Sequence, residues 1–197
     1  MVTVMAQTST PPQVGRPRSE QARRAVLHAV DDLLVETGYA AMTIKGIAER
    51  AGVGRQTVYR WWSTKAEILL EACVIDAAAE LHTEPEPDPE TDLIAYLQAL
   101  STFLITSPAG LGYRALIGEA QHDPAVRTLV READLLNASA RAVLHRVRPK
   151  APGMPGDALA TAQLVGPVVT QLLTAQDPIG QSAMRTHAAA LLKGWAG

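Results

Sequence analysis

Apolar residues recur every three or four positions along most of the chain, and this spacing predicts α-helices. The first predicted helix begins at Glu20, is capped by Ser19 and stops at Gly38, because glycine readily adopts the left-handed conformation that ends helices. No segment alternates apolar and polar residues as a half-buried strand does. The sequence therefore predicts an all-α fold.

Eight further helices follow from the same spacing. They are expected at residues 44–50, 55–62, 65–81, 91–106, 108–121, 123–147, 157–175 and 180–195. Prolines crowd residues 83–89, which are expected to form a linker because proline interrupts helices. We therefore predict three parts, which are a flexible basic arm at 1–18, a small helical unit at 19–63 and a larger helical domain at 64–197.

Composition narrows the class of protein. The chain has 197 residues, of which 47% are hydrophobic and 4% aromatic, so it can build a core that is mainly aliphatic. A single cysteine excludes an intramolecular disulfide framework and a four-cysteine metal site. No apolar run approaches the length of a membrane span and no secretory leader is evident, so we expect a cytoplasmic protein.

The net charge of −2 is unevenly distributed. Residues 1–70 carry nine Lys and Arg against six Asp and Glu, whereas residues 71–197 carry nine against fourteen. A small basic segment joined to a larger acidic one is typical of a phosphate-binding part and a part with another task. A charge fluctuation of ordinary size is the alternative.

Residues 54–62 form a short helix with two contrasting faces when they are placed on a helical wheel. One face is apolar and includes Val58 and Trp62, which suits packing against the two preceding helices. The other face is formed by Arg55, Gln56, Tyr59 and Arg60. Two short helices joined by a glycine-containing turn predict a helix-turn-helix, whose second helix enters the major groove of DNA.

The start of this helix suits base recognition. Arg55 pairs well with guanine and Gln56 with adenine, because each side chain can form two hydrogen bonds with that base. Lys45, early in the preceding helix, can reach a base or a phosphate. Taken singly, each of these residues also fits a solvated helix face, and only their joint spacing favours DNA.

Contacts with the DNA backbone are predicted from nearby hydroxyl and cationic groups. The candidates within the helical unit are Thr43, Tyr59 and Lys65. Arg16 and Arg18 lie in the N-terminal arm, where they suit phosphates or the minor groove. Such contacts position a protein on DNA without reading its sequence.

The segment from Thr43 to Lys65 resembles the signature of the tetracycline-repressor (TetR) family. The Thr43 cap, the turn at residues 51–53, the Thr57-x-Tyr59 pair and the closing Lys65 stand where that family has them. The resemblance covers roughly residues 16–70. It implies a homodimeric repressor that releases a palindromic operator when a small ligand binds the larger domain.

The resemblance also assigns roles to residues. It implies that bases are read by Lys45, Arg55, Gln56 and Thr57. Gly54 stands where many members have serine, so the recognition helix lacks a side-chain cap. A Trp61-Trp62 pair replaces a His-Phe-like pair, which leaves Trp61 one N–H donor for a phosphate and gives Trp62 the place of the buried aromatic.

The last two helices are apolar on more than one face, and they must bury more than one face. A four-helix seam with a second copy would achieve this and predicts a homodimer. Complete burial within one subunit is the alternative. A Gly166-Pro167 pair inside the penultimate helix also resembles one branch of the family.

An effector pocket is expected on the middle helices, where aromatic and polar side chains are close in sequence. The candidate lining residues are Tyr96, Phe103, Tyr113, Arg114 and His122. The alternative is that the aromatic residues fill the core and that Arg114 lies on the surface.

Catalysis finds little support in the residue pattern. The histidines show no zinc-binding spacing and no Gly-rich phosphate loop appears, so we expect neither enzyme activity nor a cofactor or metal. His82 beside acidic residues is typical of a solvated linker, and Cys73 of a small buried side chain. The remaining rivals are a small all-α enzyme and a ligand-binding helical protein that does not bind DNA.

Overall fold

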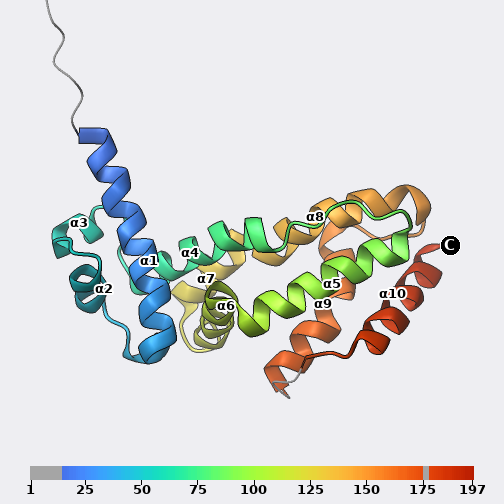
Figure 1. Ribbon diagram of the computed structural model, residues 1–197. Coiled ribbons are helices and arrows are strands. Elements are labelled where there is room, and N and C mark those ends of the chain that lie inside the picture. Colours follow the sequence, from blue (N-terminus) through green and yellow to red (C-terminus); the bar gives the residue numbers. More distant parts are fainter. Residues whose placement is uncertain (1–14, 175–177) are drawn as a thin grey trace, which may run out of the picture.

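The computed structural model describes residues 15–174 and 178–197, with side chains from Ser19 onward. All regular structure in these ranges is helical, which confirms the all-α prediction. Figure 1 shows an elongated molecule with α1, α2 and α3 at one end and α9 and α10 at the other. The helices are α1 (Gly15–Ala41), α2 (Ile44–Arg50), α3 (Arg55–Tyr59), α4 (Lys65–Glu80), α5 (Pro89–Thr106), α6 (Pro108–Glu119), α7 (Pro124–Ala133), α8 (Leu135–Val147), α9 (Asp157–Thr174) and α10 (Gln181–Trp195).

The predicted flexible basic arm is only partly described. Residues 1–14 lie outside the described residues, and so do the side chains of Arg16 and Arg18. The backbone is helical from Gly15 onward, so α1 begins earlier than the predicted start at Glu20. Pro17 fits there because a residue in the first helical turn has no intrahelical N–H bond to lose. Arg16 and Arg18 therefore lie on α1 rather than on an arm.

Local signals set the boundaries of the first four helices. Gly38 interrupts α1 with φ 75° and ψ 164°, as predicted. The Thr43 hydroxyl accepts a hydrogen bond from the Gly46 N–H at 3.1 Å, which caps α2. The α3 helix ends at Tyr59 rather than at the predicted Trp62, because Thr64 is already extended and caps α4.

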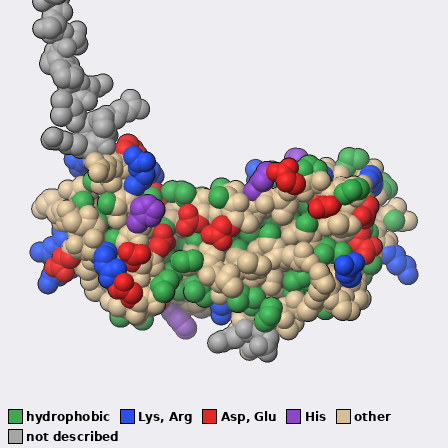
Figure 2. Space-filling view, viewed as in Figure 1, with side chains coloured by type: hydrophobic (Ala, Val, Ile, Leu, Met, Phe, Trp, Pro, Cys, Tyr) green, Lys and Arg blue, Asp and Glu red, His purple; other side chains and the backbone are tan. Residues whose placement is uncertain are grey.

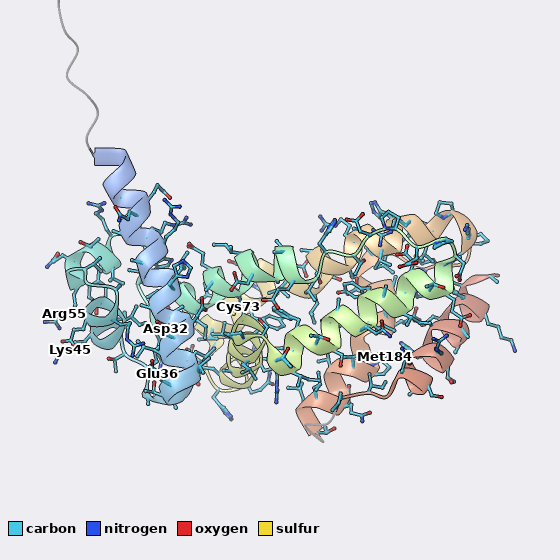
Figure 3. The ribbon with its side chains drawn as sticks, viewed as in Figure 1. Asp32, Glu36, Lys45, Arg55, Cys73 and Met184 are labelled. Atoms are coloured by element: carbon cyan, nitrogen blue, oxygen red, sulfur yellow. The ribbon has the colours of Figure 1, made fainter. Side chains whose placement is uncertain are left out.

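An arginine fastens α2 to α1. The Arg50 guanidinium forms a forked pair with the carboxylate of Glu36, at 2.8 Å for one of the two bonds, and lies 3.4 Å from Asp32. These hydrogen bonds lower the pKa of Glu36 and raise that of Arg50. Figure 3 shows Asp32 and Glu36 following each other along the lower half of α1. The contact keeps the α2–α3 unit in a defined position on α1.

The larger domain departs from the prediction between α7 and α8. One long helix was expected at residues 123–147, but the chain breaks at Asp134, which has φ 48° and ψ 35°. The single-helix prediction is therefore wrong. Aspartate is one of the few residues that adopt this left-handed conformation readily, and the Asn137 amide donates to its carboxylate at 2.5 Å. Neither glycine nor proline marks the break in the sequence.

A buried ion pair anchors the linker between α4 and α5. The Arg146 guanidinium of α8 donates to both carboxylate oxygens of Asp92, at 2.7 and 2.8 Å, and to the Thr83 hydroxyl at 3.1 Å. The Asp92 side chain is only 4% exposed, and this fork provides partners for both of its buried oxygens. The α5 helix begins at Pro89 with an Asp88 cap, slightly before the predicted start at residue 91.

Close packing at the α5–α6 corner requires a glycine. A Cβ atom at Gly110 would lie 1.9 Å from the carbonyl oxygen of Phe103. The α6 helix ends at Glu119, two positions before the predicted Gln121.

No single helix in the described ranges has the length and apolar character to cross a membrane. The α5 and α6 helices meet both criteria only as a pair bent by 79°.

The last two helices lie against the rest of the larger domain through one face each. Pro167 lies inside α9, as predicted. Two polar contacts fix α10 on α9: the Trp195 indole N–H donates to the Gln163 amide oxygen at 2.8 Å, and the His187 ring nitrogen lies 3.0 Å from the Leu164 carbonyl oxygen. The opposite faces of both helices are exposed.

Candidate nucleic-acid interface

The position of α3 is set by two buried side chains. Val58 is fully buried and Trp62 is 3% exposed, and both pack into the core formed with α1 and α2. The turn before α3 contains Gly52 at φ 65°, a conformation that glycine adopts without strain. Because these anchors occupy the inner face of α3, its polar residues face outward.

The outward face of α3 carries the predicted base-reading groups. Arg55, Gln56 and Tyr59 are exposed, and Tyr59 is among the exposed large hydrophobic residues, at 56%. Thr57 is half-buried. Gln56, Thr57 and Tyr59 line a shallow concavity together with Arg60. Hydrogen-bonding groups and one aromatic hydroxyl thus share a single accessible surface.

The residues predicted on α2 lie next to this face. Figure 3 shows Lys45 of α2 and Arg55 of α3 at the same edge of the molecule, directed away from the rest of the protein. The Lys45 ammonium lies 3.7 Å from the Glu49 carboxylate, and both side chains are about two-thirds exposed, so this pair opens at little cost. Thr43 is exposed at the start of α2, where its hydroxyl caps the helix.

Lys65 was predicted to contact a DNA phosphate, but its ammonium group bonds to the backbone of this protein. Its ammonium group donates to the carbonyl oxygens of Tyr39, Ala40 and Met42, at 2.7, 3.4 and 3.0 Å, and lies 4.3 Å from the centre of the Tyr39 ring. These three bonds use its three N–H donors and satisfy the backbone where α1 ends. The arrangement therefore supports a structural role and leaves no donor of Lys65 for a phosphate.

Trp61 and Arg60 flank the exposed face. Trp61 is half-buried and packs edge-on against Trp62, with 5.4 Å between the ring centres. The Arg60 guanidinium lies 5.4 Å from the centre of the Trp61 ring and donates to the Ser19 hydroxyl at 3.3 Å. A phosphate contact by Trp61 stays a prediction.

A polar connection between α1, the end of α3 and α4 escaped the sequence analysis. The Glu71 carboxylate of α4 accepts from the Trp62 indole N–H at 2.9 Å and pairs with Arg23 of α1 at 2.6 Å. Arg23 and Glu71 are 48 positions apart, so no local sequence pattern indicates that they are close in space. The connection ties the residue after α3 to the helix that enters the larger domain.

The sequence was compared with families and with individual proteins. The family described as "Bacterial regulatory proteins, tetR family" matches residues 26–72, from the middle of α1 to the first half of α4. The uncharacterised HTH-type transcriptional regulator YdeS of Bacillus subtilis is 38% identical over 109 residues, which is 55% of this chain and 54% of YdeS. Over residues 26–72 the chain is a member of the TetR family.

Further TetR relatives agree with this assignment. The DNA-binding transcriptional repressor TetR of Mycobacteroides abscessus is 30% identical over 121 residues, 58% of this chain and 60% of that protein. The chain thus matches only a little more than half the length of these curated relatives. The crystal structure of the TetR-family regulator SCO0332 aligns over 88% of this chain and 98% of its own, with a TM-score of 0.75 and 29% identity.

The predicted effector residues of this chain are divided between the core and the surface. Tyr96, Phe103 and Tyr113 are each 5% exposed or less and fill the core. Burial raises the pKa of both tyrosines to about 12, so their hydroxyls stay protonated, and that of Tyr96 lies 2.8 Å from the Ser139 hydroxyl. Arg114 donates to the Leu104 carbonyl at 3.3 Å, and His122 is exposed in the α6–α7 turn.

A small cavity lies elsewhere in the larger domain. It has a volume of about 270 Å³ and lies between the second half of α4 and α8. Its apolar lining includes Val74, Ala78, Leu81, Ala142 and Val143. We call it the α4–α8 cavity. The sequence analysis missed it because most of its lining residues are aliphatic and look like core residues in the sequence.

No group of side chains suited to hold a metal ion is visible in the described residues. Nowhere in residues 15–174 and 178–197 do three or more His, Cys, Asp or Glu side chains group as metal ligands would. His82 pairs only with Glu84, at 3.5 Å on an exposed surface. The Cys73 thiol is buried and donates to the Ala109 carbonyl at 3.1 Å, and burial raises its pKa far above the ordinary value.

Proposed function

We propose that this TetR-family chain is a ligand-responsive transcriptional repressor, which binds a palindromic operator as a homodimer and releases it when a small molecule binds. The observation that carries the proposal is the outward face of α3. Its apolar side is locked into the core by Val58 and Trp62, while Arg55, Gln56 and Tyr59 remain exposed. A rigid helix that presents such donors is what the major groove accepts.

Each side of this surface has a distinct role in the proposal. Arg55 and Gln56, at the start of α3, read base edges, and Lys45 of α2 reaches a neighbouring base or phosphate. Thr57 is a further base-reading candidate. Tyr59, exposed at the end of α3, donates to a backbone phosphate and fixes how deeply α3 enters the groove. Specificity and affinity are therefore expected to depend on different side chains.

A second copy supplies the other half of the operator. The exposed face of α9 carries Leu159 and Leu173, which are 55% and 48% exposed, and the exposed face of α10 carries Ala183 and Ala190. Two such helices from each copy would cover this apolar surface as a four-helix seam. The dimer must then hold its two α3 helices one DNA turn apart, about 34–36 Å.

The α4–α8 cavity is the proposed effector site. It is lined mainly by aliphatic side chains and suits a small apolar molecule. A ligand larger than the cavity would push α4 away from α8. Because Glu71 of α4 is bonded to Arg23 and Trp62, such a shift would displace α3 and change the spacing of the two α3 helices.

Binding to DNA upstream of the gene for this protein, measured by fluorescence anisotropy over a series of salt concentrations, tests the proposal. Arg55→Ala should weaken binding by about 1–3 kcal/mol at particular base pairs only, whereas Tyr59→Ala should weaken binding to all sequences alike. Arg131→Ala is the matched control, because Arg131 is a similarly exposed cation on α7. It should bind like the wild type.

Three outcomes would contradict the proposal. Equal binding to random DNA would reject sequence-specific recognition. Equal losses for Arg55→Ala and Tyr59→Ala across a panel of mutated operators would reject the division of roles. Failure to bind any DNA, with the fold intact, would favour a ligand-binding protein without a DNA target.

A further inference from the structure

A second hollow lies between α1 and α4, on the DNA-binding side of the molecule. It has a volume of about 620 Å³ and shares no lining residue with the α4–α8 cavity. We call it the α1–α4 cleft. Figure 2 shows acidic and basic side chains mixed over the region where α1 meets α4. Neither the outward face of α3 nor the proposed effector site uses this cleft.

One wall of the α1–α4 cleft is apolar. Leu27 of α1 and Ala72 of α4 are nearly buried, whereas Ile75 of α4 leaves 49% of its surface in water. An isoleucine so exposed in the middle of a packed helix offers surface that a ligand can cover. The cleft therefore favours a molecule with an apolar body.

The cleft is also lined by two carboxylates, one from each helix. Asp31 of α1 and Asp76 of α4 both line the cleft. One Asp31 oxygen is buried, and no hydrogen-bond partner for it exists in the part of the chain that the structure describes. Burial and the neighbouring Asp76 raise the pKa of Asp31 to about 6, although His28 acts in the opposite direction. A cationic donor placed here would satisfy an oxygen that is otherwise costly to bury.

The other charged residues that line the cleft do not pair with the buried Asp31 oxygen. Arg23 is directed to Glu71, at 2.6 Å, and lies 4.0 Å from Glu20. Arg24 and His28 are exposed at the rim. Three carboxylates, two arginines and one histidine line the cleft. An anionic ligand would meet the carboxylates, and a purely apolar one would leave the buried oxygen unpaired.

We propose that the α1–α4 cleft binds a small amphipathic organic cation, whose ammonium group lies between Asp31 and Asp76 and whose apolar body covers Leu27 and Ile75. The site is independent of the proposed operator and effector. Because it bridges the helix that supports α2 and α3 to the helix that enters the larger domain, an occupant would stiffen the junction between the two domains.

Binding of 2-phenylethylamine to the purified full-length chain, measured by isothermal titration calorimetry and by NMR shifts, tests this site. The neutral isostere 2-phenylethanol should bind at least about tenfold more weakly, since a charge-assisted hydrogen bond is lost. Asp31→Asn should weaken binding of the amine to a similar extent. Ile75→Lys, at an exposed position, should abolish it by placing a cation in the cleft.

Two controls locate the effect. Asp32→Asn removes the same charge one residue along α1, where the carboxylate faces Arg50 instead of the cleft, and should change affinity by less than about twofold. Ala142→Leu fills the α4–α8 cavity and should leave amine binding unchanged. Each variant is compared with the wild type by circular dichroism, so that loss of binding is separated from loss of fold.

The proposal is overturned by any of four results. These are no saturable binding of the amine, equal affinity for 2-phenylethanol, unchanged affinity in folded Asp31→Asn and Ile75→Lys, or loss of binding in Ala142→Leu alone. The last result would place the amine in the effector cavity. None of the four affects the DNA-binding proposal, which is measured without the amine.

Discussion

Replacement of Asp31 by asparagine should stabilise the protein, although it removes a charged residue from a well-packed helix. Burial between α1 and α4 raises the pKa of Asp31 from 3.8 to about 6, and the nearby Asp76 adds to the rise. Because the pKa in the folded state exceeds that in the unfolded state, the ionised carboxylate opposes folding. The penalty is absent below pH 3.8 and grows as the pH rises through 6.

The size of this effect follows from the two pKa values. A rise from 3.8 to about 6 corresponds to at most about 3 kcal/mol at neutral pH. Water still reaches part of the side chain and screens its charge, so we expect roughly 1 kcal/mol. At about pH 4 the aspartic acid is protonated in the folded protein, and the advantage of asparagine should shrink to a few tenths of a kcal/mol.

Urea unfolding followed by far-UV circular dichroism measures this difference for wild type and Asp31→Asn at about pH 7.5 and about pH 4. Comparison at equal pH cancels the titration of all other groups. Asp32→Asn is the matched control and should bring no gain, since Asp32 lies 3.4 Å from the Arg50 guanidinium. The reasoning is refuted if Asp31→Asn is less stable than wild type at the higher pH, or if its gain is the same at both pH values.

Gly110 and the Arg146–Asp92 pair each give a prediction that unfolding measurements can test. Gly110→Ala should cost at least about 3 kcal/mol, because the added Cβ would lie 1.9 Å from a backbone oxygen, whereas Gly118→Ala on the same helix meets nothing within 4 Å and should be neutral or stabilising. Equal effects of the two would contradict the close approach of α5 and α6. In the buried pair, Arg146→Met should destabilise more than Asp92→Asn, because it leaves a 4% exposed carboxylate unpaired, whereas the Arg146 side chain is 25% exposed and can turn to water. If Asp92→Asn destabilised the protein more than Arg146→Met, burial of the unpaired Asp92 carboxylate would not be the main cost of breaking the pair.

Much of the DNA-binding domain could be predicted because its boundaries depend on local chemistry. Gly38 breaks α1, Thr43 caps α2 and Thr64 caps α4, each within a few residues of the group it serves. The same is true of the two faces of α3, which follow from the helical period once Val58 and Trp62 are recognised as the buried side. Local rules suffice where donor and acceptor are close in sequence.

Other features depend on contacts between residues that are far apart in the sequence. Lys65 seemed free for phosphate, but the carbonyls that it binds belong to the end of α1, 23 to 26 residues earlier. Tyr96 and Phe103 seemed suited to a pocket, but the packing of α5 against its neighbours buries them. Asp134 breaks a helix where the sequence has neither glycine nor proline. Each outcome depends on tertiary contacts that a single sequence does not reveal.

The α4 helix brings these observations together, since it lines both hollows and is bonded to α1 and to Trp62. Glu71 connects it to Arg23 and Trp62, and the successive residues Val74 and Ile75 line the α4–α8 cavity and the α1–α4 cleft respectively. Ligands in the two hollows would therefore act on adjacent positions of one rigid helix. If one ligand favours a position of α4 that the other disfavours, each must weaken the other's binding by the same factor, because coupling between two sites is reciprocal. Titration of the amine in the presence and absence of an effector would measure that factor directly.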